Sequence, residues 1–146
     1  MHRHILTHSN GQEFCTTDYE EANNWVRTTW KGYVTAQDGE GGARETLDLL
    51  GISHAPFLLN DNSQIEGPWF DSVEWLERVW GPQAKRLGLK AVAHVMQADP
   101  NTRLDAATLD NPFADLFELQ LFTSVSEAEI WLREFQAQHT AAHPAH

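Results

Sequence analysis

The chain has 146 residues, 41% hydrophobic and 21% charged, which suits one globular domain and excludes a disordered or fibrous protein. It carries 10 Lys and Arg against 21 Asp and Glu, and this net charge of -11 excludes nucleic acid as the expected partner, because phosphate binding needs clustered cations. No apolar run approaches the roughly 20 residues of a transmembrane segment, and the N-terminus lacks a signal peptide's apolar stretch, so we expect a cytoplasmic protein.

The first third of the chain predicts an antiparallel meander. Residues 3–8 and 12–18 have the composition of strands, and the Asn-Gly pair within residues 9–11 favours a tight hairpin turn between them. A third strand is expected at 25–34. Its more apolar face should point to the core and consists of Val26, Thr28, Trp30, Gly32 and Val34.

The pattern then changes to alternating helices and strands. Residues 36–50 predict a helix that stops at Gly51, and the glycines within residues 39–42 weaken its first turns, so its regular part is expected from about Ala43. A short apolar strand follows at 56–60.

The next predicted helix covers residues 71–87. Asp71 and Glu74 have the spacing of a capping box, in which each side chain accepts a backbone N–H that the helix leaves unpaired. Pro82 lacks a backbone donor and clashes with the preceding turn, so we expect two helical pieces, with Gly88 ending the second. The expected buried stripe is Leu76, Val79, Trp80 and Leu87.

Residues 90–97 form a nearly continuous apolar run, as in a parallel strand that is covered on both faces. The long crossover from strand 56–60 implies that these two strands are parallel. A further strand is expected at 117–122, after an irregular crossover, and a final helix at 125–136.

Together these elements predict an α/β fold at the border of α+β, with a mixed sheet that is antiparallel at first and parallel afterwards, and helices packed largely on one side. We expect one domain over residues 1–138 and a disordered tail over 139–146. Cys15 is the only cysteine, and the histidines near the two termini lack ligand spacing, so neither a metal nor a cofactor is predicted.

A set of polar residues follows strand 56–60 and suggests a binding site. In parallel sheets, ligands bind outside the carboxyl ends of the strands, where Asn60, Asp61 and Asn62 should lie beside residues 97–99. Trp69 is then a candidate lid. The alternative is that this loop only turns the chain, because Asn and Asp favour turns.

His94 is the only histidine within a predicted core strand. It is either a general base with a depressed pKa or a side chain that donates to a backbone carbonyl. No nucleophile or phosphate-loop pattern accompanies it, so no catalytic residue is assigned. Trp75 falls outside the buried stripe of its helix, and it either contributes to a partner surface beside Trp69 or packs under the crossover that follows strand 90–97.

Three segments carry a resemblance to a known family: NNWVRTTWKGYVT, then APFLLNDNSQIEGPWFDSVEWLERVWGPQAKRLGLKAVAHV, then LFTSVSEAEIWLRE. Over residues 12–136 the chain resembles small bacterial STAS-like (SpoIIAA-like) proteins, which are grouped with CRAL-TRIO lipid-carrying domains. The resemblance implies a mixed sheet with helices largely on one side.

The resemblance also implies a modification site. In anti-sigma-factor antagonists of this class, an Asp-Ser pair opens the helix after a central strand, and a kinase phosphorylates the serine. Asp71-Ser72 is the matching pair here, but Glu74 and Trp75 stand where small residues are expected. Asp71 and Glu74 would also repel a phosphate group.

Our leading hypothesis is a non-enzymatic STAS-like module that binds a partner protein or small molecule through residues 60–72 and the surface of Trp69 and Trp75. The rival hypothesis is an enzyme in which His94 acts as acid or base with Asp61 or Asp71. A carrier of apolar ligands such as lipids is a third hypothesis, and a homodimer is left open.

Overall fold

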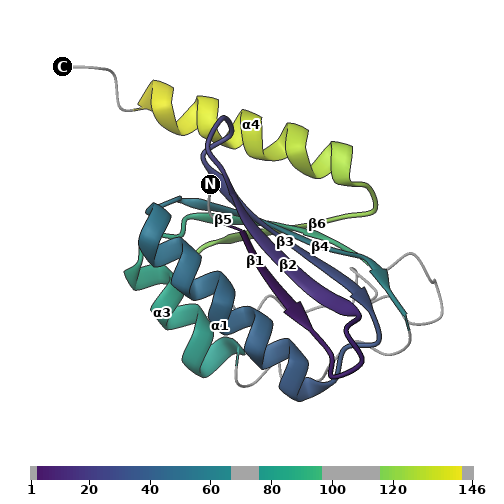
Figure 1. The fold of residues 1–146 in the computed structure, drawn as a ribbon. Helices are drawn as coiled ribbons and strands as arrows, with labels where there is room; N and C mark the ends of the chain where they lie inside the picture. The colour runs from purple at the N-terminus through teal and green to yellow at the C-terminus, as the bar shows by residue number, and fades with distance from the viewer. Residues whose placement is uncertain (1–2, 67–75, 97–115, 143–146) are drawn as a thin grey trace.

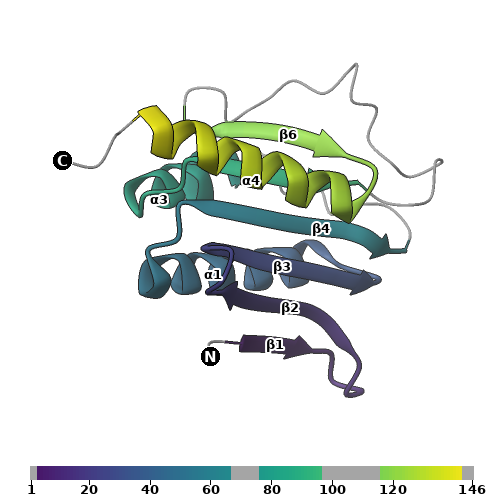
Figure 2. The same ribbon diagram turned by 90° about the horizontal axis from the view of Figure 1, so that it is seen from above.

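The structure is a computed structural model, and it describes residues 3–66, 76–96 and 116–142. One six-stranded sheet forms its centre, with the strands side by side in chain order (Figure 2). The first three strands pair antiparallel and the remaining neighbours pair parallel, which confirms the predicted mixed α/β sheet. The strands are β1 (Arg3–Thr7), β2 (Glu13–Glu20), β3 (Trp25–Gly32), β4 (Phe57–Ile65), β5 (Ala91–Val95) and β6 (Glu118–Phe122).

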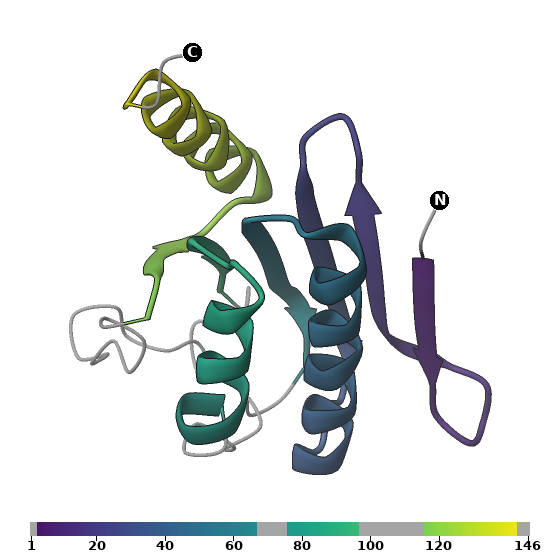
Figure 3. The same cartoon turned by 90° about the vertical axis from the view of Figure 1, so that its left-hand side faces the viewer.

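Helices cover both faces of this sheet. Helices α1 (Ala36–Ser53) and α3 (Gly81–Arg86) lie side by side on one face, and α4 (Val125–Ala142) lies on the other (Figures 1 and 3). Two of these helices therefore share a face, as expected, while α4 adds a third layer. It also extends beyond the expected end at residue 136 and into the segment predicted as a tail.

Two apolar layers result, one on each side of the sheet. In β4, Leu58 packs on the side of α1 and α3, whereas Phe57 and Leu59 pack under α4. Strand β5 likewise contributes to both layers, as its continuous apolar run predicts. Trp25 is 0% exposed, although it lies on the face of β3 expected to be outward, because α4 covers that end of the strand.

Helix α1 begins earlier than the sequence analysis predicted. Thr35 and Asp38 form a capping box: the Thr35 hydroxyl accepts from the Asp38 N–H at 3.1 Å, and the Asp38 carboxylate accepts from the Thr35 N–H at 3.3 Å. The helix therefore starts at Ala36 rather than near Ala43. Gly42 lies against β3, where a Cβ would sit 2.4 Å from a ring carbon of Trp30, so this glycine permits close packing.

The C-terminal end of α1 also differs from the expectation. The helix continues through Gly51 to Ser53 and ends at His54, which adopts the left-handed conformation with φ 57°. The His54 N–H then donates to the carbonyl of Leu50. The predicted stop at Gly51 was wrong because a non-glycine residue three positions later, His54, takes the capping role.

The helical segment after β4 is described from Leu76 onward, so the predicted capping box of Asp71 and Glu74 lies outside the described residues. A π-helical turn, η1 (Leu76–Trp80), leads into α3. Pro82 therefore coincides with a change of helix type, while the backbone of Trp80 stays helical. Leu87 is 36% exposed rather than part of the buried stripe.

Candidate functional site

Strand β4 is longer than predicted and includes the polar residues that we expected in a loop. It pairs with β3 as far as Gly32 and Ile65, across a register irregularity between Thr29 and Lys31. Asn60, Asp61 and Asn62 are therefore strand residues, and the prediction that a loop begins at Asn60 was wrong. The neighbouring strand supplies backbone partners that local sequence does not reveal.

β4 and β5 run parallel, as predicted, so their carboxyl ends point to the same edge of the sheet, although β4 continues to Ile65, beyond its last partner in β5. Asn60 is the ladder partner of His94, and Asp61 is the partner of Val95. Residues 97–99, which were expected at the same edge, lie outside the described residues.

Four side chains from three neighbouring strands form a hydrogen-bonded group at this edge, which we call the amide–imidazole cluster. The Trp30 indole N–H donates to Asn60 Oδ1 at 2.8 Å. Asn60 Nδ2 lies 3.1 Å from His94 Nδ1, and Asn62 Nδ2 lies 3.2 Å from His94 Nε2. Asn62 is 1% exposed and His94 is 9% exposed, so the cluster is largely shielded from water.

The amide–imidazole cluster carries no net charge near neutral pH. Burial lowers the pKa of His94 to about 4, and the negative charge of Asp61 opposes this effect only in part. The imidazole is therefore neutral, and the remaining cluster side chains are two carboxamides and an indole. Such a group can recognise a ligand by hydrogen bonding but not by ion pairing.

Asp61 does not face His94. Its ladder partner Val95 packs in the layer under α4, whereas His94 meets the two carboxamides on the side of α1 and α3. The Asp61 carboxylate accepts from the backbone N–H and the hydroxyl of Ser63, at 2.9 and 2.6 Å. This arrangement does not provide the hydrogen-bonded acid–base pair that catalysis by Asp61 and His94 requires. Asp71 lies outside the described residues.

One polar atom of the cluster has no partner. Within the described ranges, Asn62 Oδ1 is a buried side-chain oxygen without a hydrogen bond. A buried polar group in this state costs about 1–3 kcal/mol, so its presence calls for a physical explanation.

The structure brings together three of the predicted site residues and adds a fourth. Asn60, Asn62 and His94 meet as described, and Trp30 joins them from β3. Trp30 was predicted to face the core. Its position beside Asn60 depends on the register of β3 against β4, and no local sequence pattern predicts that register. Of the other predicted site residues, Asp61 bonds to Ser63 outside the cluster, and Trp69, Asp71, Ser72 and Trp75 lie outside the described residues.

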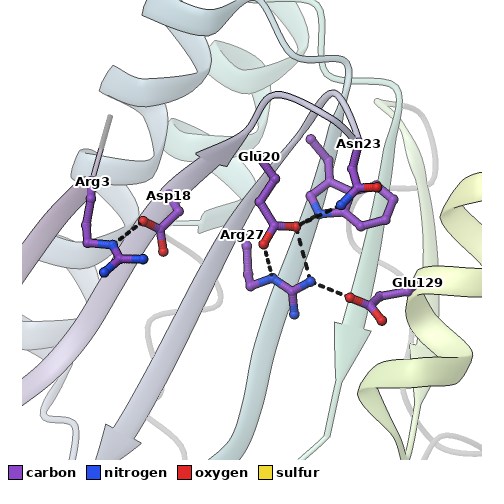
Figure 4. Close-up of polar contacts among 7 residues, drawn as sticks. Arg3, Asp18, Glu20, Asn23, Arg27 and Glu129 are labelled. Carbon is purple, nitrogen blue, oxygen red and sulfur yellow. Dashed lines mark hydrogen bonds and ion pairs between the residues drawn. The ribbon is translucent and has the colours of Figure 1, made fainter. Parts of the chain in front are cut away.

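A second polar group lies at the opposite end of β3 and joins side chains of β2, β3 and α4 (Figure 4). Arg27 donates to both carboxylate oxygens of Glu20, at 2.9 and 3.1 Å, and also to Glu129 of α4. Burial alone would raise the pKa of Glu20, but these bonds and one from the Trp25 indole lower it. Because one guanidinium bonds to a carboxylate of β2 and to a carboxylate of α4, this group ties α4 to the sheet.

Figure 4 also shows an ion pair between β1 and β2, in which Arg3 donates to Asp18. In the part of the chain that the structure describes, no three His, Cys, Asp or Glu side chains are grouped as metal ligands. None of the helices described has the length and apolar character that crossing a membrane demands.

Comparison with known proteins adds no family assignment: no protein-family model matches the chain, and no curated protein matches it at a significant level.

Proposed function

We propose that this chain is a non-enzymatic recognition module of the cytoplasm, STAS-like in kind, that binds a partner protein or small molecule at the carboxyl ends of β4 and β5. The amide–imidazole cluster is the observation that carries this proposal. All four of its members are neutral side chains with hydrogen-bonding capacity, and they converge near the carboxyl ends of parallel strands, where ligands commonly bind.

The charge state of His94 supports binding rather than catalysis. A side chain with a pKa of about 4 is a weak general base at neutral pH, because its affinity for a proton is low. Its two ring nitrogens also face carboxamides, which neither activate nor stabilise an imidazolium as a carboxylate would.

The order of elements supports the STAS-like part of the proposal. An antiparallel meander precedes parallel strands in one sheet, as the resemblance implies. In this proposal, Trp69, Asp71, Ser72 and Trp75 extend the recognition surface from the strand ends. The exposed Gln64, which pairs with Lys31 in the β3–β4 ladder, lies outside it. Phosphorylation of Ser72 would regulate binding by adding negative charge beside it.

The test is a comparison of variants in a binding assay. Asn60→Ala and Trp69→Ala remove a cluster amide and the predicted lid, and Gln64→Ala is the matched control on β4, where Gln64 is exposed. Proteins that co-purify with the tagged wild-type chain are identified, purified and titrated against each variant by calorimetry. We expect both site variants to weaken binding by roughly tenfold or more, while the control binds like the wild type.

Equal binding by all three variants, with melting temperatures showing that each is folded, would contradict the placement of the site. Binding that is lost equally in Gln64→Ala would also contradict it, because that change lies outside the cluster.

A further inference from the structure

The orientation of the Asn60 carboxamide follows from its tryptophan partner. An indole nitrogen can only donate a hydrogen bond, so the atom of Asn60 that faces Trp30 must be the acceptor Oδ1. The Asn60 NH2 group is then the atom that faces His94 Nδ1 at 3.1 Å. Because an NH2 group donates, His94 Nδ1 must be the unprotonated ring nitrogen.

The second ring nitrogen settles the orientation of Asn62. A neutral imidazole carries one proton, so when Nδ1 accepts, Nε2 carries the hydrogen and donates. The atom of Asn62 that lies 3.2 Å from Nε2 must therefore accept, although an NH2 group is placed there. Rotating the carboxamide of Asn62 by half a turn resolves the conflict, since its oxygen and nitrogen occupy nearly equivalent positions.

The rotation changes the chemistry of the unpartnered position. Asn62 Oδ1 is buried without a hydrogen bond, and after the rotation the NH2 group takes its place. The cluster then presents the N–H donors of Asn62, shielded from water, at a position where the carboxamide oxygen makes no hydrogen bond within the described residues. A donor in such a site gains most from an oxygen acceptor that comes with a ligand.

We infer that the amide–imidazole cluster binds an uncharged oxygen acceptor, the carbonyl of an amide or peptide group, through the side-chain NH2 of Asn62. This inference rests on the proposed function and names the ligand chemistry of the same site. An anionic acceptor is disfavoured because Asp61 adjoins Asn62 and the chain carries a net charge of -11. A cationic ligand is disfavoured because the rotated Asn62 places an N–H donor, rather than an oxygen acceptor, at the unpartnered position.

The first experiment tests the proton arrangement in the unmodified protein. Nitrogen-15 NMR of the labelled wild-type chain at pH 7 distinguishes the two ring nitrogens of His94 by their chemical shifts. We expect the proton on Nε2 and an unprotonated Nδ1. A proton on Nδ1 would overturn the inference, because the Asn62 carboxamide would then keep its oxygen in the unpartnered position.

The second experiment titrates three small probes and follows the side-chain NH2 signals of Asn62. N-methylacetamide offers a neutral carbonyl, acetate a charged acceptor, and methylammonium only donors. We expect saturable shifts with N-methylacetamide, a response to acetate that is roughly tenfold weaker, and none to methylammonium. A response to methylammonium, or a response to acetate that is stronger than the response to N-methylacetamide, would overturn the inference. The absence of any response would also overturn it and would indicate that the position holds an enclosed water molecule.

A pair of variants then tests the donor itself. Asn62→Asp keeps an acceptor for His94 Nε2–H but removes the NH2 group, and Gln64→Glu makes the same chemical change at an exposed position of the same strand. We expect Asn62→Asp to weaken the N-methylacetamide response of the His94 signals by about tenfold or more, and Gln64→Glu to preserve it. The wild-type titration decides the question independently if Asn62→Asp does not fold.

The two levels of the proposal fail in different ways. If Asn60→Ala abolishes partner binding while N-methylacetamide leaves the Asn62 NH2 signals unchanged, the site stands and the ligand chemistry is wrong. If Asn62 responds to N-methylacetamide while Asn60→Ala, Trp69→Ala and Gln64→Ala all bind the partner equally, the cluster takes carbonyl ligands but is not the partner's site.

Discussion

His94 stays neutral because the sheet and its carboxamide neighbours exclude water from the ring. Its pKa is about 4 in the folded protein, compared with about 6.5 for an exposed histidine. Below pH 6.5 the unfolded chain therefore binds a proton that the folded chain does not. The contribution of His94 to stability is thus fully present above pH 6.5 and is lost as the pH falls toward 4.

We predict that this linkage lowers the free energy of unfolding by about 2 kcal/mol between pH 7.5 and pH 5. The measurement is urea denaturation of the wild type and of His94→Gln at both pH values. Because all other histidines and carboxyl groups are common to the two proteins, the difference between their pH dependences isolates His94. The same pH dependence in both proteins would show that the ring is not shielded as described.

Other residues at this scale act through the shape of their neighbours. Gly42 leaves room for the Trp30 ring, which in turn positions Asn60, so a glycine on α1 contributes indirectly to the geometry of the cluster. The sequence shows that three glycines occur near residue 40, but not which of them lies against a tryptophan. Only the packing of α1 on β3 decides that.

At the scale of elements, the beginning of α1 depends on a local signal in the sequence, a capping box just before its glycines. Thr35 and Asp38 have the spacing of a capping box, and their reciprocal bonds satisfy backbone donors that the first turn leaves unpaired. These bonds offset the weak helix propensity of the glycines that follow.

We predict that Thr35→Ala destabilises the protein by about 1 kcal/mol, because the Asp38 N–H loses its acceptor. Gln37→Ala is the control, since Gln37 is exposed in the same turn and lies outside the capping box. Chemical denaturation followed by circular dichroism measures both. If Gln37→Ala is as costly as Thr35→Ala, the capping box does not hold the start of this helix.

Strands β4 and β5 show which structural features a local sequence pattern can predict and which it cannot. The strand β5 and its parallel neighbour β4 were predicted correctly, because a continuous apolar run and a long crossover are strong signals. The continuation of β4 to Ile65 was missed, because its polar residues resemble a turn and only the pairing with β3 makes them a strand. Part of the predicted site therefore lies in regular structure.

At the scale of the whole molecule, the sheet separates two apolar layers, and α4 covers one of them. Leu132 is fully buried in α4 and packs in the layer that includes Trp25, Leu59 and Val95. The Arg133 guanidinium lies 5.5 Å from the centre of the Trp25 ring and adds a cation–π contact between helix and sheet.

We predict that Leu132→Ala lowers the free energy of unfolding by about 2–5 kcal/mol, because it opens a cavity between α4 and the sheet. Ile130→Ala, two positions before Leu132 and on the exposed side of α4, should change it by no more than about 0.5 kcal/mol, since Ile130 is 53% exposed. Guanidinium denaturation monitored by tryptophan fluorescence compares the two. Equal effects of these two substitutions would mean that α4 is not docked through the Leu132 face.

The sequence by itself determined the class of fold, the order of the elements and the parallel central strands, because hydrophobic periodicity and connection length are local properties of the chain. It also predicted that the strands carrying Asn60 and His94 are parallel neighbours, as their ladder pairing confirms. The tertiary structure alone decided that Asp61 and His94 face opposite layers, that Trp30 joins the cluster, and that Asn62 has an unpartnered carboxamide atom. These facts depend on strand register and on packing between distant segments, and no local pattern of residues encodes either.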